Sequence, residues 1–577
     1  MFEEPKVKPS VRRDVVRGHH AVVIGIDDYV DPSLHLAGCA AHAAWMAKVL
    51  ICRGYRVEAL HDGLGSASPP TQDAVLAALR AVMDTAGEDH LVLVHVSCRG
   101  RLIDGRPHLL LADTPNTDEG VVVHGLPLAT VLDTLRGAPR WVALFLDVRG
   151  VGLGLDPGTS ESADHGDERD GGFALLAAGT REDPATGDFS RLLIEGLAGA
   201  AADSQGAVRF SALARLVQDG LARTGSERPR PAPVLRLEVS DLLLVPPHAY
   251  RELAPPLSAK IGCAAFSPDG SLVATGSDDR SVRLWDAITG AQVREPMWHE
   301  AAVCALTFSD DGRQLWSASA DGLLGRWDVA TAMAIEPAPA QLGAAGVSAV
   351  ALSRNGELLV ATSFDLDRRD DVMRVLLDPA LAEKTDFISR IWVRDASGTT
   401  EVLYVDPGPL AVAFLEGPDR FVSGGTDGEV RVWDARTAAW ELLGNHDGPV
   451  EALAVSPDRR YVAAGGADHV PSPTLFNEVR IWERATGTCI GLRGHRARVA
   501  SIAYASDGTR LATACHDGLA RLWDAASGHL LCEIAAAVDG RPYHAEAHVV
   551  AFSPDGRRLL VGYGDGRAWT FELPETR

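Results

Sequence analysis

The chain has few of the features that would place it in a membrane or an oxidising compartment. Its longest apolar runs, such as 91–96 and 142–146, are far shorter than the roughly 20 residues of a transmembrane helix. Its first residues lack the apolar core and the small-residue cleavage site of a signal peptide. Its 8 cysteines form no CxxC pair, which argues against a disulfide framework and a thiolate metal site. We therefore expect a cytoplasmic protein with mostly buried cysteines, no metal and no cofactor.

Positive charge is also scarce. Lys and Arg number 55 against 78 Asp and Glu, and the net charge is -23 at pH 7. Such a field repels phosphate backbones and anionic lipid, so we expect neither nucleic acid nor membrane as a partner. The chain is nevertheless rich enough in hydrophobic residues, at 46%, to bury more than one core over its 577 residues.

The C-terminal half consists of a repeated unit. From residue 257 onward, a short apolar run, a turn of the Ser-Pro-Asp-Gly type and a second run precede an Asp and, six residues later, an aromatic residue. Seven units follow one another with a basic spacing of about 41 residues, interrupted by insertions at 364–388 and 468–475. We expect the insertion at 364–388 to be either a decorated loop or an element that docks a partner.

The unit resembles the WD repeat, in which about 40–45 residues form one four-stranded blade of a β-propeller. By this resemblance, the Asp lies in the turn between the second and third strands and forms hydrogen bonds within the blade. The fifth unit has Phe476 at this position and is expected to lack the bond. The resemblance also implies structural roles for three histidines at blade starts, His299, His446 and His495. The predicted structural positions are Asp279, Asp321, Asp386, Asp427, Asp517, Asp565, Trp285, Trp327, Trp392, Trp433, Trp482 and Trp523.

The last unit ends soon after its third strand, so its fourth strand must come from elsewhere in the chain. Residues 249–255, just before the first repeat, are the natural donors. We predict an all-β seven-bladed propeller at 257–577, closed by a strand from the linker at 246–256. The repeats gather no nucleophile, base or metal ligand in one cluster, and the resemblance implies protein–protein interaction.

The N-terminal half has a different pattern. After an N-terminal arm at 1–19, residues 20–245 alternate strand-like and helix-like segments. This predicts an α/β domain with a mostly parallel six-stranded sheet flanked by helices. The expected strands are 21–26, 56–60, 90–96, 108–112, 141–147 and 173–178, and the expected helices are 40–53, 71–85, 126–135, 188–197 and 211–223.

The order and wording of these segments resemble the caspase-like cysteine peptidases, in particular their metacaspase-type bacterial members. The segments HAVVIGIDDY at 20–29, LVLVHVSCRG at 91–100 and VALFLDVRG at 142–150 carry the resemblance. It implies a catalytic His in a Ser-Gly-His-Gly turn and a catalytic Cys in an Asp-x-Cys turn, because the reaction needs a thiolate and a base. Here these turns read Ser-Cys-Arg-Gly at 97–100 and Asp-Val-Arg-Gly at 147–150.

Both catalytic positions of the family are therefore arginine, Arg99 and Arg149. A guanidinium has no lone pair at neutral pH and cannot act as a base or a nucleophile. The resemblance further implies an acidic pair that binds a basic substrate side chain. His42 replaces one member of that pair, whereas Asp147 retains the other. We expect a pseudoenzyme with no catalytic residues.

Another pair could replace the missing dyad, and Cys98 with His95 is the nearest candidate. These residues are three apart on one expected strand, so their side chains point to opposite faces, which disfavours a dyad. The acidic segment 156–170 is expected to be a solvated loop, which only another protease would cut.

Two arginines near one another need compensating charge. Asp27 and Asp147 lie at neighbouring strand ends, which favours a structural Arg–Asp network. The alternative is that Arg99 and Arg149 hold a carboxylate, such as an acidic peptide side chain, through bidentate bonds. The possible peptide cleft comprises Asp27, His42, Cys98, Arg99, Asp147 and Arg149.

The expected function is that of a catalytically inactive caspase-like protein whose propeller binds protein partners as a scaffold, sensor or regulator. An active peptidase is one possible partner. A role in bacterial signalling or defence is implied only by the resemblance to caspase-like/WD-repeat fusions. Two alternatives stay open: an active caspase-family endopeptidase with a displaced dyad, and a passive assembly platform without a ligand cleft.

Overall fold

The computed structural model describes two compact units of the chain. The first is formed mainly by residues up to Pro246 and the second mainly by Pro247–Pro574. No helix in the described part of the chain is long and apolar enough to cross a membrane. The described residues are 18–61, 69–87, 89–136, 141–149, 172–180, 188–203, 207–223, 234–237, 242–245, 250–321, 323–335, 346–352, 359–364, 389–394, 400–405, 409–416, 420–434, 437, 439–467, 477–535, 537–538, 541–542 and 545–573.

The first unit is built on one main sheet with the strand order β2-β1-β3-β6-β7-β9. Neighbouring strands are parallel except for the last pair, in which β9 runs antiparallel to β7. The strands are β1 (Gly18–Gly25), β2 (Arg56–His61), β3 (His90–Ile103), β6 (Trp141–Arg149), β7 (Gly172–Thr180) and β9 (Val234–Leu237). The predicted mostly parallel six-stranded sheet is confirmed, and its first strand begins inside the segment expected to be the arm.

One expected member of the sheet was wrong. The segment 108–112 does not form a central strand, because β4 (Arg106–Leu109) folds back on the end of β3 and pairs with the short β5 (Leu126–Pro127). The reversal occurs at Asp104 and Gly105, whose φ angles are 49° and 77°. An Asp-Gly pair with positive φ at both residues is the typical two-residue hairpin turn. The sixth strand of the sheet is β9, which the sequence pattern did not predict.

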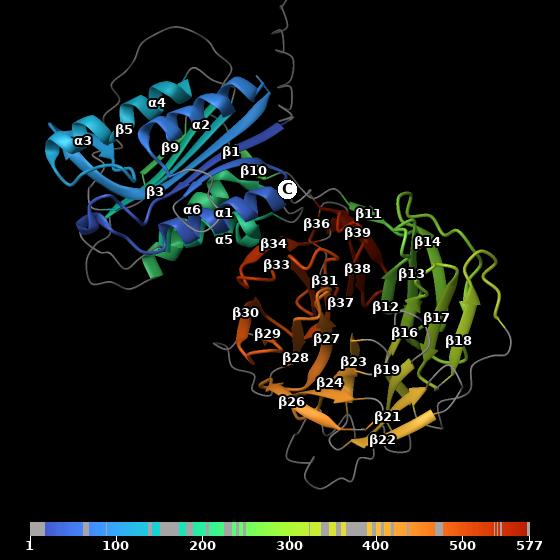
Figure 1. Ribbon diagram of the computed structural model, residues 1–577. Helices are drawn as coiled ribbons and strands as arrows, with labels where there is room; N and C mark the ends of the chain where they lie inside the picture. The colour runs from blue at the N-terminus through green and yellow to red at the C-terminus, as the bar shows by residue number, and fades with distance from the viewer. Residues whose placement is uncertain are drawn as a thin grey trace, which may run out of the picture. The chain divides into compact units, whose positions relative to one another are not determined.

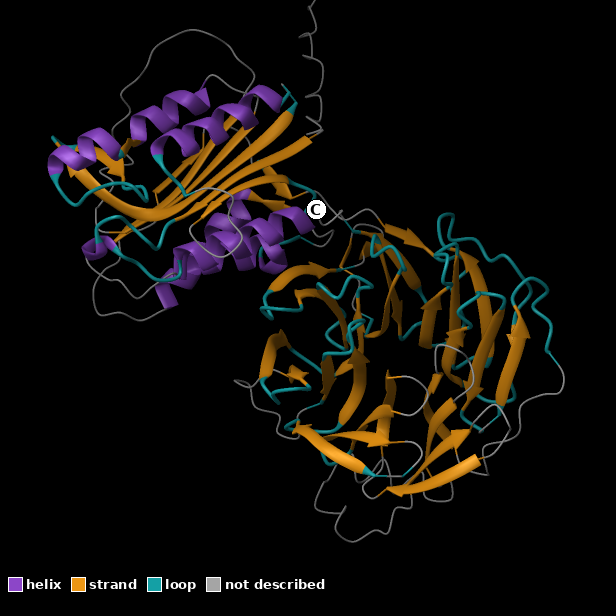
Figure 2. Ribbon diagram, viewed as in Figure 1, coloured by secondary structure: helices purple, strands orange, loops and turns teal. Residues whose placement is uncertain are grey.

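Helices cover both faces of this sheet (Figure 2). One layer contains α2 (Gln72–Thr85), α3 (Asp118–His124) and α4 (Leu128–Arg136), and the other contains α1 (Cys39–Cys52), α5 (Asp188–Glu195) and α6 (Phe210–Arg223). A π-helical turn (Gly196–Ala200) extends α5, a 3-10 turn (Pro32–Leu34) precedes α1, and β8 (Val208–Arg209) pairs with β10 (Leu243–Val245). Because side chains alternate along a strand, β3 sends Val92, Val94, Val96 and Cys98 into the apolar core that α2 and α4 complete.

The second unit consists of seven antiparallel sheets, the blades of a propeller (Figure 1). Among the described residues six blades have four strands and the second has three. Blades one to three are β12 (Ile261–Phe266), β13 (Leu272–Ser277), β14 (Ser281–Asp286) and β15 (Met297–Trp298); β16 (Val303–Phe308), β17 (Gln314–Ser319) and β18 (Leu324–Asp328); and β19 (Gly346–Leu352), β20 (Leu359–Phe364), β21 (Ser389–Arg394) and β22 (Thr400–Val405). Blades four and five are β23 (Pro409–Glu416), β24 (Arg420–Gly425), β25 (Glu429–Asp434) and β26 (Trp440–Asn445); and β27 (Val450–Val455), β28 (Tyr461–Gly466), β29 (Asn477–Glu483) and β30 (Cys489–His495). Blades six and seven are β31 (Val499–Tyr504), β32 (Arg510–Cys515), β33 (Ala520–Asp524) and β34 (Leu530–Ile534); and β37 (Ala547–Phe552), β38 (Arg558–Tyr563), β39 (Ala568–Glu572) and β11 (Tyr250–Glu252), with a small β35 (Ala537–Val538) and β36 (Arg541–Pro542) hairpin between them.

The ring closes as the sequence predicts. Strand β11 pairs antiparallel with β39, with Tyr250 opposite Phe571 and Glu252 opposite Trp569. The first strand of each blade contacts the first strand of the next, and β37 of the last blade contacts β12 of the first. The strand from 249–255 therefore supplies the outer edge of the seventh blade, which its own three strands would leave unpaired.

The repeated tryptophans are anchored inside their blades by the same hydrogen bond. In four blades the indole N–H donates to a hydroxyl on the second strand, at 2.7 to 3.0 Å. The hydroxyl also contacts a histidine in two blades, at 2.7 Å for His299 and 2.8 Å for His495. His446 differs, because its Nε2 contacts the carbonyl oxygen of Glu478 at 2.6 Å. The four pairs are Trp285 with Thr275, Trp327 with Ser317, Trp433 with Ser423 and Trp523 with Thr513.

The repeated aspartates lie in the turns between second and third strands. Each carboxylate accepts from the backbone N–H two residues later, an Asx turn that holds the strand reversal. The N–O distances are 2.9 Å for Asp279, 3.0 Å for Asp321 and Asp427, 3.1 Å for Asp517 and 3.2 Å for Asp565. Trp482 is buried, and only the backbone of Trp392 is described. Asp386, Phe476, the insertions 365–388 and 468–475 and the segment 156–170 lie outside the described residues.

Candidate functional site

The two arginines of the first unit lie side by side where neighbouring parallel strands end. In the register of β3 and β6, Arg99 is opposite Arg149 and Ser97 is opposite Asp147. The carboxyl ends of parallel strands are where α/β domains place their ligand and catalytic groups. The structure therefore brings together the two positions at which the caspase-like pattern requires its dyad.

Arg99 is held by the segment that precedes helix α1. Its Nε donates to the carbonyl oxygen of Leu34 at 2.5 Å, and its Nη2 donates to that of His35 at 3.3 Å. Its backbone N–H donates to the phenol oxygen of the buried Tyr29 at 2.8 Å. The half-buried guanidinium thus closes the end of β3 against the 34–35 backbone.

Arg149 is more deeply buried, with 4% of its surface exposed. Its Nη1 donates to the carbonyl oxygen of Ala37 at 3.3 Å, whereas Nε and Nη2 are buried with no hydrogen-bond partner. A buried cation with unsatisfied donors is costly unless opposite charge lies nearby. Asp147, two residues earlier, points to the same side of β6. Burial raises the pKa of Asp147, and the charge of Arg149 opposes this rise.

Asp147 belongs to a buried polar network between β3, β6 and α5. Its Oδ2 accepts from the hydroxyl of Ser190 at 2.6 Å and from that of Ser97 at 3.5 Å. Ser190 also contacts Nε2 of His95 at 3.2 Å. Burial raises the pKa of Asp147, although the bond from Ser190 and the charge of Arg149 oppose this shift.

Asp147, Ser190 and His95 are the residue types of a catalytic triad. Their hydrogen bonds, however, connect them in an order that does not activate the serine. A nucleophilic serine must give its proton to the histidine, with the carboxylate behind the histidine. Here Ser190 stands in the middle and donates to Asp147. His95 is fully buried, and burial lowers its pKa to about 3. The network is therefore suited to holding the strands and α5 together.

The nearby thiols are poorly placed for chemistry. Cys98 lies in the apolar core on one face of β3, whereas His95 contacts Ser190 of α5 on the other face. Burial raises the pKa of the Cys98 thiol well above its usual range. Cys39, at the start of α1, is also buried, and burial raises its pKa to about 12 despite the opposing charge of Arg149. Both thiols are protonated at neutral pH, and a protonated thiol is not a nucleophile.

Asp27 does not form the expected ion pair with an arginine but accepts hydrogen bonds from backbone N–H groups. Its carboxylate accepts from the backbone N–H groups of Gly38, Cys39 and Ala40, at 3.1, 2.7 and 3.2 Å. It thereby caps helix α1, where unpaired N–H groups and the helix dipole favour an anion. His42 lies one turn further along α1. Burial lowers the pKa of His95, and His42 adds a smaller electrostatic effect in the same direction.

The expected Arg–Asp network was therefore wrong in its contacts. Among the described residues neither guanidinium forms an ion pair with an aspartate, and the hydrogen bonds of both go to carbonyl oxygens at 34–37. The physical reason is that Asp27 is engaged by helix α1 and Asp147 by Ser190. Only the electrostatic effect of Arg149 on Asp147 remains of the network.

Sequence reasoning missed Ser190 and the carbonyl groups. Ser190 had a signal, because it is the one polar residue among the buried positions of α5, which otherwise are Phe189, Leu192, Leu193 and Ile194. Its burial among four apolar residues of the same helix indicates a buried acceptor. The carbonyl groups at 34–37 had no sequence signal, because every residue carries a backbone carbonyl.

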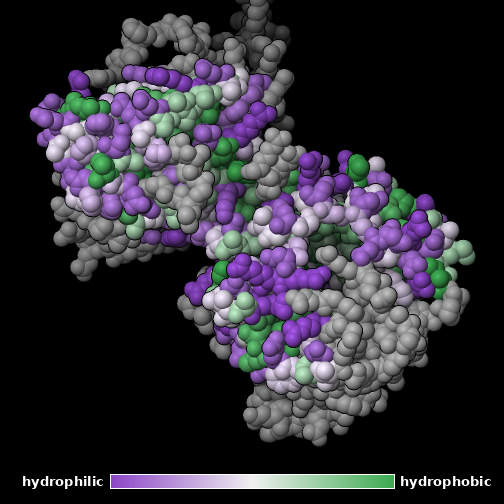
Figure 3. Space-filling model, in the orientation of Figure 1, coloured by the Kyte–Doolittle hydropathy of each residue, from purple (hydrophilic) through white to green (hydrophobic). Residues whose placement is uncertain are grey.

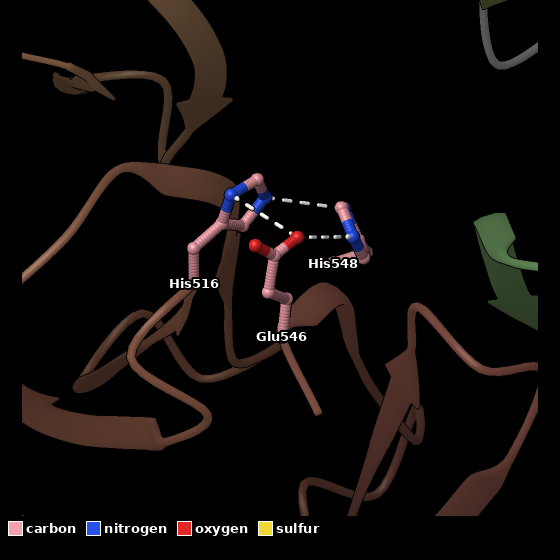
Figure 4. Close-up of side chains that lie close together, drawn as sticks. All are labelled: His516, Glu546 and His548. Carbon is pink, nitrogen blue, oxygen red and sulfur yellow. Dashed lines mark hydrogen bonds and ion pairs between the residues drawn. The ribbon is translucent and has the colours of Figure 1, made fainter. Parts of the chain in front are cut away.

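The propeller holds a second cluster that sequence reasoning missed. His516, Glu546 and His548 bring potential metal-ligand atoms within 4.8 Å of one another (Figure 4). The expectation that the repeats gather no metal ligands was therefore wrong. The alternation of Glu546 and His548 was the available signal, since residues two apart on a strand share a face.

Comparisons with known proteins agree with both units. The model of the caspase domain matches residues 18–218, and that of the WD domain, G-beta repeat, matches 252–286, 405–434, 440–470 and 487–524. Similar proteins include periodic tryptophan protein 2 of Arabidopsis thaliana, 26% identical over 313 residues that cover 54% of this chain and 26% of the relative. Telomerase protein component 1 of Mus musculus is 28% identical over 302 residues, 46% of this chain and 11% of the relative. Transcription initiation factor TFIID subunit 5 of Caenorhabditis elegans is 41% identical over 83 residues, 14% of this chain and 13% of the relative. The chain spans about a quarter or less of the length of these relatives. It combines a caspase-like domain with a WD-repeat β-propeller.

Proposed function

We propose that the caspase-like domain has no peptidase activity and that the protein acts through protein–protein interactions as a scaffold, sensor or regulator. The observation that carries this proposal is the pair of arginines at the two catalytic positions. Arg99 and Arg149 are register partners at the ends of β3 and β6, and both donate to the 34–37 backbone. Neither can take a proton from a nucleophile or attack a carbonyl carbon.

The thiols of the domain support the same proposal. Cys98 and Cys39 are the cysteines nearest these positions, and burial holds the pKa of each thiol far above neutral pH. A cysteine peptidase needs the thiolate and an adjacent base. After its first residue, β3 contains one histidine, His95. His95 contacts Ser190 on the face of β3 opposite to Cys98.

The propeller supplies the interaction surface of this proposal, since WD repeats generally mediate contacts between proteins. The names of two similar proteins, a telomerase protein component and a subunit of a transcription initiation factor, describe parts of larger assemblies. Hydrophilic and hydrophobic residues are interspersed on the part of the propeller surface that Figure 3 colours. With a net charge of -23, we propose protein rather than nucleic acid as the partner, in the cytoplasm and in a bacterial signalling or defence pathway.

A finer part of the proposal concerns what the caspase-like domain binds. Arg149 has two buried donors, Nε and Nη2, that no hydrogen bond satisfies. A carboxylate accepts two parallel N–H bonds from one guanidinium, which makes it the group that Arg recognises best. We propose that an acidic peptide side chain, presented by a partner such as an active peptidase, binds at Arg149 with help from Arg99.

The peptidase question has a direct test. The full chain is incubated with fluorogenic peptides carrying a basic or an acidic residue at the cleavage position, and with a thiol-reactive covalent probe. We expect no turnover above that of the C98A variant and no labelling at Cys98 or Cys39. The R99H/R149C double variant restores the residue types of the dyad and serves as the positive arm. Turnover by the natural chain that C98A abolishes would overturn the pseudoenzyme proposal.

The peptide question is tested separately by binding. A short Glu-containing peptide and its Gln-containing counterpart are titrated into the natural chain and into R149A, R99A and R101A. We expect the acidic peptide alone to bind, with at least a tenfold loss in R149A. R101A is the matched control, because Arg101 is on the same strand and pairs with Asp118 at 3.4 Å on the exposed side. Equal binding by the natural chain and R149A contradicts the carboxylate site and leaves the pseudoenzyme proposal standing.

A further inference from the structure

The cluster on the propeller is formed by two adjacent blades. His516 directly follows β32 of the sixth blade, Glu546 directly precedes β37 of the seventh, and His548 lies within β37. The backbone N–H of His516 donates to the carbonyl of Arg498 at 2.9 Å, and that of Gly564 donates to the carbonyl of Glu546 at 3.0 Å. The ligand positions are therefore fixed by the backbone of two rigid sheets that contact each other.

The side chains point toward one another (Figure 4). Nε2 of His516 is 3.2 Å from Nδ1 of His548, and the Glu546 carboxylate is 3.6 Å from Nδ1 of His516 and 3.3 Å from Nε2 of His548. Ligand atoms around a tetrahedral zinc ion with bonds of about 2.0–2.1 Å are separated by roughly 3.3 Å. The imidazole–imidazole contact and the carboxylate contacts use different ring nitrogens. One ligand atom of each residue nevertheless lies within 4.8 Å of the others, so rotation of the rings and the carboxylate would bring one atom of each to a common ion.

The surroundings favour ligation by neutral imidazoles. The two histidine side chains are 16% and 11% exposed, whereas Glu546 is 56% exposed and leaves the cluster open to solvent on one side. Burial of an imidazole disfavours its charged form. A neutral imidazole offers the nitrogen lone pair that a metal needs.

We propose that His516, Glu546 and His548 bind one divalent transition-metal ion of the zinc class, which joins blades six and seven of the propeller. Two imidazoles and one carboxylate form a common protein donor set for zinc. Three protein ligands leave a fourth position for water or for a group of a partner protein. This site goes beyond the proposed scaffold function and does not depend on the caspase-like domain.

Gly564 makes room for the site. A Cβ atom at Gly564 would lie 3.1 Å from Nε2 of His548, tighter than ordinary van der Waals contact. The residue at this turn therefore has to be small for the imidazole to keep its position beside Glu546. We expect G564A to weaken zinc binding about tenfold by displacing the ring, since a ligand has to keep its distance from the metal within about 0.2 Å.

Nearby cations set the electrostatic limit of the site. Arg498 forms an ion pair with Glu451, which compensates its charge. The positive charge of Lys260, at the start of the first blade, disfavours a positive charge at both histidines, as the charge of Arg498 does. A positive charge opposes a bound dication, so K260Q is expected to tighten zinc binding several-fold.

The test uses zinc ions as the only probe. The full chain is freed of metal with a chelator and titrated with Zn²⁺ by calorimetry, and the zinc retained after desalting is counted. We expect one ion per chain, a loss of at least 100-fold in affinity in H548Q and H516Q, and a loss of about 10-fold to 100-fold in E546Q. Zinc should also raise the melting midpoint of the natural propeller, and the same zinc concentration should raise that of E546Q less.

A second histidine pair provides the matched control. His20 and His90 of the first unit are joined at 3.0 Å between ring nitrogens, much like His516 and His548. H90Q is expected to keep the ion. The proposal is overturned if the metal-free chain takes up no zinc, or if H90Q removes the ion while E546Q keeps it. Glu546 is exposed, so E546Q tests the site even if a histidine variant fails to fold.

Discussion

The propeller and the caspase-like domain carry their polar contacts in different ways. In the propeller one contact recurs: the indole of Trp285, Trp327, Trp433 and Trp523 donates to a hydroxyl ten residues earlier in its own blade. In the caspase-like domain each contact occurs once, as in the bond from Ser190 to Asp147. A recurring residue can be recognised as structural by comparing the chain with itself. A residue that occurs once has to be interpreted from its chemistry.

The repeated turns of the propeller and the buried network of the caspase-like domain also shift the pKa of a carboxylate in opposite directions. In the propeller the side chain of Ser267 and the backbone N–H of Ser271 lower the pKa of Asp269, an exposed turn residue. In the caspase-like domain burial raises the pKa of Asp147. Hydrogen bonds to a solvated carboxylate favour its charged form, whereas removal from water disfavours it. Repeated turns thus use acids as exposed acceptors, and the single network holds its acid in the interior.

The largest effect is expected from a repeat aspartate whose arginine is buried. Arg521 is 1% exposed in its side chain and forms ion pairs with Asp517 at 2.8 Å and with Glu533 at 3.0 Å. D517A leaves a buried guanidinium with one partner fewer and should destabilise the propeller by about 3 kcal/mol. Denaturant unfolding, monitored by tryptophan fluorescence, measures this change.

The equivalent substitution in the seventh blade is the matched control. Arg567 and Asp565 are 32% and 41% exposed at a separation of 3.7 Å, and exposed pairs contribute at most about 1 kcal/mol. D565A should therefore cost less than D517A. Equal losses would mean that the Asx turn, which both variants remove, and not the buried ion pair, sets the stability of the repeat.

A smaller loss of stability is expected from a change in the buried network around Asp147. S190A removes the donor at 2.6 Å from Asp147 and the partner of His95, and leaves a buried carboxylate less satisfied. We expect the caspase-like domain to lose about 1–3 kcal/mol. S97A is the milder control, because Ser97 lies 3.5 Å from the same oxygen. S190A should shift the unfolding transition of the caspase-like domain, and D517A that of the propeller. A shift of the same transition by both variants would contradict independent unfolding of the two units.

Much of the fold follows from the sequence because it rests on patterns. The repeat spacing predicts seven blades, and the missing last strand predicts the donor that becomes β11. The hydrophobic runs predict most strands of the first sheet. Pattern alone does not tell which strand a segment pairs with, so the hairpin after Asp104 and Gly105 was missed. The short β9 was missed as well, because four residues carry too little periodicity.

The candidate site was predictable only in part. The positions of Arg99 and Arg149 followed from the resemblance, and the parallel register brings them together. Their partners did not follow, because Leu34, His35 and Ala37 contribute backbone carbonyls, which have no sequence signature. The same holds for the zinc-class cluster, whose two blades are joined only by the closure of the ring. Residue types are readable from a sequence, but contacts between distant segments depend on the tertiary structure.

The stability of the first unit is expected to depend on pH through His95. Burial lowers the pKa of His95 to about 3 from the ordinary 6.5. Below pH 6.5 the unfolded chain binds a proton that the folded domain does not, so this contribution to stability falls with pH until about pH 3. The slope is about 1.4 kcal/mol per pH unit for one proton. Asp147 acts in the opposite sense, because its raised pKa favours protonation in the folded domain.

H95Q separates these two groups. Glutamine keeps a side-chain N–H for Ser190 but has no proton to gain, so the variant should lose most of the slope between pH 6 and about pH 4. Melting midpoints of the first unit across that range, for the natural chain and H95Q, give the comparison. Parallel curves would show that His95 does not titrate on unfolding and that other groups cause the slope.

The smallest effect concerns thiol reactivity and leaves stability unchanged. Cys489, in the propeller, is the exposed cysteine among the eight, whereas Cys39, Cys52 and Cys98 of the caspase-like domain are all buried. A thiol reagent needs access and thiolate. Burial raises the pKa of Cys98 well above its usual range and also raises that of Cys489, so the contrast rests mainly on access. We expect one thiol per native chain to react quickly, and C489S to remove that fast phase while leaving the slower ones unchanged. A fast phase that survives in C489S but disappears in C98A would place a reactive thiol beside Arg99. The contrast between the exposed cysteine of the repeats and the buried cysteines of the caspase-like domain would then fail.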